Sequence, residues 1–139
     1  DQIRTLDSVR RHLNPGGEFV FNIFVPEIDM LAQEGDVPYY FRDVTDCETG
    51  HRLVISHQSK YDNYNQIIDA RLIAEVLDGE GTVARRFYRD FRLRYVHRWE
   101  MHHLLELCGF DVLALYGDFD KSPFEESSTE MVWVASMSG

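Results

Sequence analysis

Three histidines and a glutamate lie within one short segment, and such side chains bind metals or transfer protons. The segment is His97-x-x-Glu100-x-His102-His103, in which Glu100 and His103 are three residues apart. In a helix that spacing places both side chains on one face. A di-iron site uses this Glu-x-x-His spacing on two helices and needs further glutamates on facing helices. No second helix of this kind is predicted here. The favoured interpretation is a surface helix with His97 as its N-cap and Glu100 in the position of a capping box.

Five arginines lie close together in a second segment that could bind an anionic substrate. They are Arg85, Arg86, Arg89, Arg92 and Arg94. A guanidinium pairs with a carboxylate or a phosphate through two parallel hydrogen bonds. The favoured interpretation is instead an exposed strand face, on which these cations pair with neighbouring carboxylates. Those carboxylates belong to Asp69, Glu75 and Asp90.

The composition indicates a globular domain rather than a disordered or membrane-spanning chain. Of the 139 residues, 44% are apolar and 13% are aromatic, which is enough for a hydrophobic core. The formal net charge of −10 disfavours binding to nucleic acid or to an anionic membrane. No apolar run approaches the ~20 residues that span a bilayer. We therefore expect neither nucleic acid nor a membrane as a partner.

The first residues of the chain indicate how it arose, and its two cysteines indicate the compartment in which it is found. The sequence begins Asp-Gln-Ile-Arg, without methionine and within a helical pattern, so we interpret it as an excised domain or a proteolytic product. No signal peptide is visible. Cys47 and Cys108 stand far apart without C-x-x-C spacing. A disulfide between them stays open, but a reducing compartment is the simpler interpretation, and we expect a cytoplasmic protein.

The N-terminal part of the chain predicts a helix followed by a buried strand. Apolar residues in steps of three or four indicate an amphipathic helix, which Asn14-Pro15-Gly16-Gly17 ends. Its apolar residues are Ile3, Leu6, Val9 and Leu13. The run 18–25 is nearly continuously apolar, as is typical of a strand covered on both faces. Pro26 ends this strand. Residues 27–33 are expected to form one or two helical turns, and residues 39–41 are expected to form a loop or an edge strand.

The middle of the chain alternates between apolar and polar residues, which predicts antiparallel strands. Even positions from 68 to 76 are apolar, as are odd positions 87, 91, 93 and 95, and Asp78-Gly79-Glu80-Gly81 indicates a hairpin turn between them. A two-residue loop at Gly79-Glu80 pairs residues whose numbers sum to 159. This register joins three pairs: Leu72 with Phe87, Ile68 with Phe91, and Asp69 diagonally with Arg92. Residues 53–61 are expected to add a third strand.

The C-terminal part predicts one more helix and two more strands. Leucines in "HRWEMHHLLELCGF" indicate a helix that Gly109 closes. Apolar runs at 110–116 and 130–137 follow as strands, joined by a long loop. The predicted order is therefore helix, strand, three-stranded ribbon, helix, strand, strand.

Three of these segments resemble class I methyltransferases that use S-adenosylmethionine (SAM). "HLNPGGEFVFNIF" is similar to that family's L-x-P-G-G-x-apolar segment. "RLRYVHRWEMHHLLELCGFDVLALYGDF" is similar to its late helix and strand, and "EMVWVASM" to its last strand. The resemblance covers roughly the first 25 and the last 45 residues.

This resemblance implies the C-terminal half of a Rossmann-like α/β fold, or an α+β fold for the isolated fragment. The family's last strand inserts antiparallel, so the core strands would lie in the order fifth, seventh, sixth. An antiparallel three-stranded ribbon at about 51–96 would be inserted before the late helix. In some small-molecule members such a ribbon covers the substrate or builds a dimer interface. We expect residues 1–139 to form a single domain.

The resemblance also implies that the cofactor-binding part lies outside this chain. The family binds SAM with a Gly-rich turn after its first strand and an acidic residue that ends its second. This sequence has no G-x-G-x-x-G, and its one Gly-x-Gly, Gly79-Glu80-Gly81, is interpreted as a hairpin turn. The first four strands would precede Asp1. We therefore expect no cofactor-binding residue in this chain, poor binding of SAM, and no activity of the chain alone.

Seven residues are candidates for binding the methyl acceptor. They are Asn22, Phe24, Pro26, Tyr39, Tyr40, Arg94 and Tyr95. The first three lie at the carboxyl end of the opening strand, where open α/β sheets place ligands. The tyrosines at 39 and 40 belong to an expected lid, and the last two end the ribbon. Core packing is an equally good interpretation of Phe24 and Tyr95, and no general base or metal ligand is assigned.

The leading hypothesis is the acceptor-recognising C-terminal part of a SAM-dependent methyltransferase that acts on a small molecule. Without a fourth strand the edge at 18–25 would be open, and open edges recruit partners, so we expect a homodimer or a missing N-terminal half. The alternative is a non-catalytic α+β module for small-ligand binding or dimerisation, with a helix pair inside one sheet made mostly of the ribbon. A hydrolase is disfavoured because no nucleophile-elbow motif frames a serine.

Overall fold

The computed structural model describes residues 1–26 and 28–139, and the chain forms two compact units. Unit 1 consists of Asp1–Glu27 and Val96–Gly139, and unit 2 consists of Ile28–Tyr95. Each unit has its own antiparallel sheet. That the two units act as a single domain stays a prediction.

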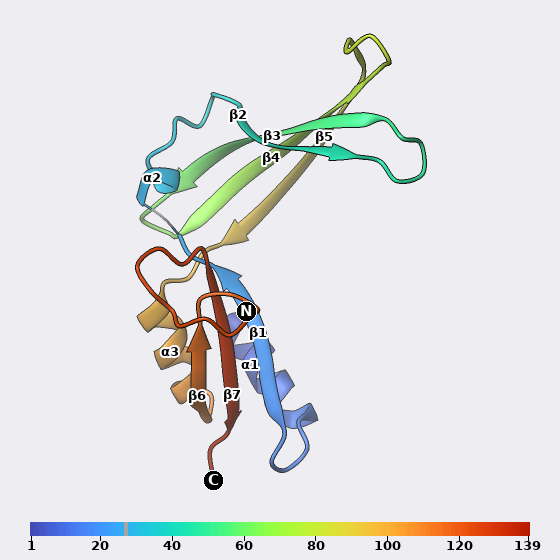
Figure 1. Ribbon diagram of the computed structural model, residues 1–139. Helices are drawn as coiled ribbons and strands as arrows, with labels where there is room; N and C mark the ends of the chain where they lie inside the picture. Colours follow the sequence, from blue (N-terminus) through green and yellow to red (C-terminus); the bar gives the residue numbers. More distant parts are fainter. Residues whose placement is uncertain (27) are drawn as a thin grey trace. The chain divides into compact units, whose positions relative to one another are not determined.

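Unit 1 is a three-stranded sheet with two helices packed against one face (Figure 1). Its strands are β1 (Glu18–Phe24), β6 (Phe110–Tyr116) and β7 (Glu130–Met137), and its helices are α1 (Gln2–His12) and α3 (Arg98–Leu107). The strand order is β1-β7-β6, and both pairings are antiparallel. The last strand of the chain is therefore central, in agreement with the predicted order of fifth, seventh and sixth strands.

The core of unit 1 lies between the two helices and one face of this sheet. Its largest fully buried side chains are Leu105, Phe110, Met131 and Trp133. Each side chain of this kind contributes ~1.5–3 kcal/mol when it leaves water. Phe21 stacks on Trp133 with ring centroids 6.5 Å apart, which ties β1 to the central strand.

β1 is covered on one face, although the sequence predicts a strand covered on both. Phe19, Phe21 and Ile23 pack against the core, whereas Val20 between them is 57% exposed. Leu113 on β6 is similarly exposed. The cause is that α1 and α3 pack on the same face, so an apolar run in this antiparallel sheet does not mean burial on both sides.

Both helices end close to their predicted positions. Gly16 has a φ of +75°, and the amide of Gly17 donates a 2.8 Å hydrogen bond to the carbonyl of Asn14 after α1. α3 begins after His97, the predicted N-cap, whose side chain makes no capping hydrogen bond. Ile3 is exposed, so the apolar stripe of α1 is one residue shorter than predicted.

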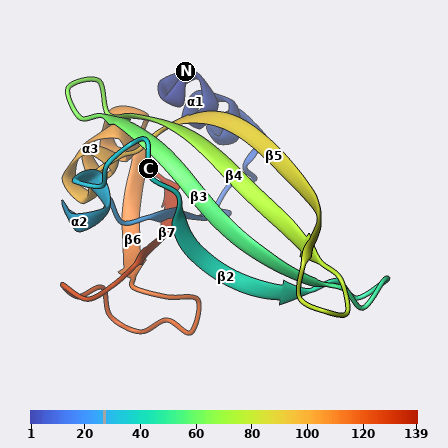
Figure 2. The same cartoon turned by 90° about the horizontal axis from the view of Figure 1, so that it is seen from above.

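Unit 2 is a four-stranded antiparallel sheet in which the strands follow in chain order. They are β2 (Tyr39–Thr45), β3 (Arg52–Asp62), β4 (Ile67–Leu77) and β5 (Val83–Arg94). Figure 2 shows the long strands of this sheet twisting and curving together. The predicted three-stranded ribbon is wrong by one strand, because the segment predicted as a loop or edge strand is the edge strand β2. The predicted helical turns at 27–33 correspond to α2 (Ile28–Leu31), and Glu27 itself lies outside the described residues.

The turn between β4 and β5 is longer than the two residues predicted. The amide of Asp78 donates to the carbonyl of Thr82 over 2.9 Å, and Gly81 inside the turn has a φ of +83°. The Asp78 carboxylate accepts hydrogen bonds from the amides of Glu80 and Thr82. The loop thus contains three residues, with a glycine in the left-handed conformation and a bulge beside Leu77.

The extra loop residue and the bulge together change the register of the hairpin by two residues. Leu72 faces Arg89 instead of Phe87, and Ile68 faces Leu93 instead of Phe91. Asp69 lies directly opposite Arg92 rather than diagonal to it. Because the change is an even number, every side chain keeps its predicted face of the sheet.

Two further findings concern the chain as a whole. Neither cysteine forms a disulfide: Cys47 is exposed in unit 2, and Cys108 is buried in unit 1. None of the helices among the described residues is long and apolar enough to cross a membrane.

Candidate functional site

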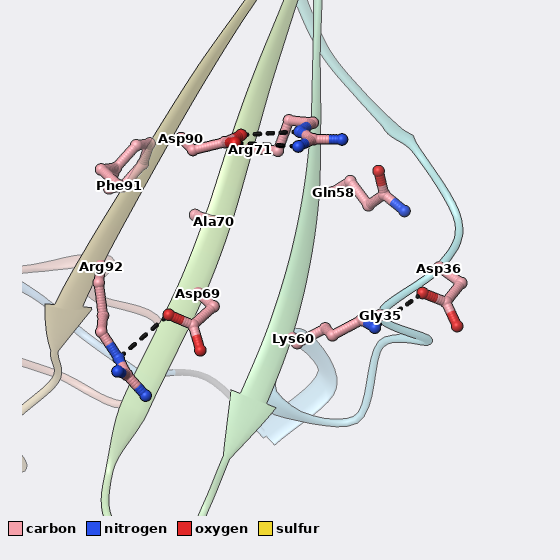
Figure 3. Close-up of a pocket in the computed structure, with 10 residues that line it drawn as sticks. All are labelled: Gly35, Asp36, Gln58, Lys60, Asp69, Ala70, Arg71, Asp90, Phe91 and Arg92. Carbon is pink, nitrogen blue, oxygen red and sulfur yellow. Dashed lines mark hydrogen bonds and ion pairs between the residues drawn. The ribbon is translucent and has the colours of Figure 1, made fainter.

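One face of unit 2 has a depression of about 600 Å³ lined by charged side chains (Figure 3). Three ion pairs line it: Lys60 with Asp36 at 3.2 Å, Arg71 with Asp90 at 2.7 Å, and Arg92 with Asp69 at 3.1 Å. Figure 3 shows the two arginine pairs bridging neighbouring strands. Three cations therefore meet three carboxylates, and these groups together carry no net charge.

The pair of Arg71 with Asp90 favours the charged form of both side chains. The Nε and Nη2 atoms of Arg71 donate to the two carboxylate oxygens of Asp90 over 2.7 and 2.9 Å. These bonds hold the pKa of Asp90 below its ordinary value of 3.8 and raise the pKa of Arg71. Arg71 and Asp90 therefore form an exposed ion pair rather than an acid–base pair.

The five clustered arginines divide between the two faces of the sheet. Arg86 pairs with Glu75 and Arg92 with Asp69, as the favoured interpretation predicts. Arg94 donates to the side-chain oxygen of Gln66 over 2.9 Å. Arg85 and Arg89, in contrast, alternate with these residues along β5 and project from the opposite face. The expectation that all five arginines share one exposed strand face is therefore wrong, because Arg85 and Arg89 lie on the other face.

That opposite face, which we call the aromatic face, carries a row of four register partners. Tyr39 faces His57, His57 faces Leu72, and Leu72 faces Arg89, so the row crosses all four strands. The rings of Tyr39 and His57 stack with centroids 5.9 Å apart. The ring of Phe41 meets His57 edge-on at 6.3 Å, although Phe41 itself is 56% exposed.

His57 is the residue of this row with acid–base chemistry. Burial lowers its pKa from the ordinary value of 6.5, so the neutral form of the imidazole predominates at pH 7. A neutral imidazole has one nitrogen that donates and one that accepts a hydrogen bond. The sequence-based site prediction does not include His57. The alternation in 53–61 places it on one face, but its neighbours follow only from the register between β2, β3 and β4.

Three predicted acceptor-binding residues belong to unit 1. Asn22 is exposed on β1, and its Nδ2 donates to the Glu130 carboxylate over 3.1 Å. Phe24 is half-buried opposite Glu130, and Pro26 is buried. They lie at or just beyond the carboxyl end of β1, as predicted.

The other four predicted residues belong to unit 2 and do not form one cluster. Tyr39 and Tyr40 are on opposite faces of the edge strand β2, and Tyr40 is 66% exposed. Arg94 and Tyr95 lie at the far end of β5, five and six positions beyond the row that contains Tyr39. Tyr95 is 2% exposed, and its hydroxyl donates to the side-chain oxygen of Asn63 over 3.1 Å. An acceptor-binding role for these seven residues stays a prediction.

The histidines of α3 form a surface cluster. His102 and His103 each lie 3.3 Å from the Glu106 carboxylate, and the Trp99 ring contacts both imidazoles. Within the part of the chain that the structure describes, no group of three or more histidine, cysteine or acidic side chains could hold a metal ion.

Sequence comparisons do not identify this chain, whereas structural comparisons do find similar folds. No family model matches the sequence, and no curated protein matches it. A SAM-dependent methyltransferase from Clostridium acetobutylicum matches 100% of this chain and 53% of its own, with 17% identity and a TM-score of 0.73. The CcbJ methyltransferase from Streptomyces caelestis matches 99% of this chain and 50% of its own, with 25% identity and a TM-score of 0.71.

A third solved structure shows the same fold. It is CalS10 from Micromonospora echinaspora, an amino pentose methyltransferase with SAM bound. It matches 98% of this chain and 50% of its own, with 18% identity and a TM-score of 0.63. The chain therefore spans about half the length of each of these solved methyltransferases. The resemblance noted in the sequence is confirmed, and the chain has the fold of part of a SAM-dependent methyltransferase.

Proposed function

We propose that this chain is the acceptor-recognising part of a cytoplasmic SAM-dependent methyltransferase that acts on a small molecule. The observation that carries the proposal is a fold match over the whole chain but only about half of each solved methyltransferase. An amino pentose methyltransferase among these similar structures supports a small-molecule acceptor. The free thiols of Cys47 and Cys108 agree with a reducing compartment.

The residues of this chain do not fit the cofactor. A SAM site in this fold needs backbone amides of a Gly-rich turn and a carboxylate for the ribose hydroxyls. The one Gly-x-Gly closes the β4–β5 hairpin, where the Gly81 amide already donates to the Asp78 carbonyl over 3.1 Å. We therefore place cofactor binding outside this chain and assign it no catalytic step.

What this chain can contribute is recognition and positioning of the acceptor. Methyl transfer is a displacement in which the acceptor atom must be held in line with the donor. The strand order favours this proposal over a non-catalytic cupped module, because β1 lies beside β7 in a sheet separate from the ribbon. A cupped module would instead wrap a helix pair inside one sheet.

The test is a methyl-transfer assay with labelled SAM and a panel of small amines and hydroxylated molecules. The 139-residue chain is compared with a longer protein that includes whatever coding sequence precedes Asp1. We expect label transfer to small acceptors by the longer protein and none by the chain alone. Transfer by the chain alone would contradict the proposal, as would a longer protein that methylates none of the panel.

We also propose that the free edge of β1 pairs with another strand, either of a second copy or of a missing N-terminal half. In the described residues β1 pairs with β7 on one side, and open edges recruit partners. Val20→Lys puts a charge on this strand, and Leu113→Lys is its control at a similarly exposed position on β6. In analytical ultracentrifugation we expect the chain and Leu113→Lys to dimerise and Val20→Lys to be monomeric. A monomeric wild-type chain would rule out the homodimer.

A further inference from the structure

The aromatic face of unit 2 carries positive charge without acidic residues. Register places residues of β3, β4 and β5 on it, at odd positions 53–61, even positions 68–76 and odd positions 85–93, and none of these is acidic. Arg85 and Arg89 are among them. In a chain with a net charge of −10, this distribution favours an anionic ligand at this face.

The cations of the two faces differ in their partners. On the opposite face Arg71, Arg86 and Arg92 each pair with a carboxylate across the strands. Among the described residues no carboxylate lies within ion-pair distance of Arg89, and Arg85 contacts the Phe87 ring at 5.2 Å. A guanidinium forms strong hydrogen bonds with carboxylate or phosphate. Within the described structure, the Arg89 guanidinium therefore has no carboxylate partner and is available to bind an anionic group.

Aromatic rings flank Arg89 along its own strand. Phe87 is 48% exposed and Phe91 is 39% exposed. Their register partners on β4 are Ala74 and Ala70, whose side chains are too short to cover a ring. Two phenyl rings thus border the guanidinium and remain accessible for stacking.

A second group of rings lies at the other end of the same row. Tyr39 and Phe41 contact the neutral imidazole of His57, which is two strands away from Arg89. Strands in a sheet are ~4.8 Å apart, so the backbones of His57 and Arg89 are separated by roughly 10 Å. A ring with one charged substituent can span that distance, with Leu72 between the two ends.

We propose that the aromatic face binds a small molecule that carries both a ring and an anionic group, either phosphate or carboxylate. The ring stacks near Tyr39, Phe41 and His57, and the anionic group pairs with Arg89. This inference deepens the proposed function, because it gives the chemical class of the acceptor. Binding itself requires neither SAM nor methyl transfer, so it can be measured on this chain alone.

The test is titration of four probes into the 139-residue chain, followed by two-dimensional NMR of the backbone amides. Phenyl phosphate and benzoate combine a ring with an anion, inorganic phosphate is the anion alone, and benzyl alcohol is the ring alone. We expect at least one of the combined probes to bind about tenfold more tightly than either single part. We expect its largest shifts at His57, Leu72 and Arg89.

Two variants with matched controls locate the binding. Arg89→Gln removes the unpaired cation and is expected to weaken the combined probe about tenfold or more, the effect of one charge-assisted hydrogen bond. Arg92→Gln removes a paired cation of the opposite face and is expected to change the affinity less than about twofold. Phe41→Ser is expected to weaken it about threefold or more. Its control is Tyr88→Ser, because Tyr88 is 58% exposed on the opposite face, and this variant is expected to leave the affinity unchanged.

Several results would overturn the inference. They are the absence of binding by every probe, equal losses in Arg89→Gln and Arg92→Gln, and inorganic phosphate binding as tightly as phenyl phosphate. Shifts confined to the opposite face would do so too. None of these results bears on whether the longer protein binds a cofactor, so failure here is distinguishable from failure of the proposed function.

Discussion

The carboxylate of Asp69 lies 3.1 Å from Nε of Arg92, its register partner across β4 and β5. The same cross-strand pairing joins Arg71 to Asp90 and Arg86 to Glu75 along one face of the hairpin. Except for Glu75, these side chains are about half exposed or more, and exposed pairs contribute little to stability. In this register each of these cations lies opposite a carboxylate, and the turn before β5 sets the register.

The conformation of Gly81 gives the first prediction. Its φ of +83° lies in the left-handed region, where a side chain costs ~1–2 kcal/mol. Gly81→Ala should therefore lower the free energy of unfolding by about that amount in urea denaturation. Gly79→Ala is the control, because Gly79 lacks a positive φ and a Cβ there meets no atom within 4 Å. Equal effects of the two substitutions would contradict this account of the turn.

The second prediction concerns the core of unit 1. Leu105 on α3 is 0% exposed, so Leu105→Ala should lower the free energy of unfolding by ~2–5 kcal/mol through lost burial and a residual cavity. Leu107 on the same helix is 72% exposed, and Leu107→Ala should change stability by no more than about 0.5 kcal/mol. Thermal and urea unfolding of both variants measure the difference. A loss below about 1 kcal/mol for Leu105→Ala would show that α3 does not pack as described.

The third prediction follows from the lowered pKa of His57. Because burial depresses the folded-state pKa below the ordinary 6.5, the unfolded chain takes up the proton first as the pH falls. The His57 contribution to stability is therefore fully present above pH 6.5 and is lost as the pH falls from there toward the folded-state pKa. Comparing unfolding at pH 7.5 and 5.5, we expect a smaller loss in His57→Gln than in the wild type. An NMR titration with the His57 pKa at or above 6.5 would contradict this prediction.

The fourth prediction separates the two cysteines. Cys47 is exposed, whereas Cys108 is buried, and burial raises the pKa of the Cys108 thiol. Thiolate is the reactive form, so a disulfide reagent should modify one thiol per folded chain rapidly and the second only after denaturation. Cys47→Ser should remove the rapid phase. A rapid phase that persists in this variant would mean that Cys108 is accessible.

The periodic segments of the sequence were sufficient to predict most of the fold. Apolar spacing predicts α1 and α3, because burial on one face of a helix imposes that spacing directly. Continuous apolar runs predict the strands of unit 1, although not that β1 is covered on one face only. The register of β4 and β5 was not predictable by counting, since a left-handed Gly81 and a bulge add residues that alternation does not reveal. β2 was harder to recognise because an edge strand needs fewer apolar residues.

The aromatic face shows why the candidate site was only partly predicted. The place of Tyr39 after the first strand makes it a candidate, but its neighbour His57 is 18 positions further along and becomes adjacent through the β2–β3 pairing. Sequence proximity groups the arginines of β5. Alternation along the strand divides them, and the register with β4 determines which have a carboxylate partner.

We propose that this chain is part of a methyltransferase whose cofactor site lies outside these 139 residues. The most direct test of this proposal is calorimetric titration of S-adenosylhomocysteine into the 139-residue chain and into a longer protein that includes the preceding coding sequence. The account predicts binding by the longer protein and no measurable heat of binding for the chain alone. Tight binding by the 139-residue chain would contradict this prediction. Binding by neither protein would mean that the chain shares the fold of these methyltransferases without their activity.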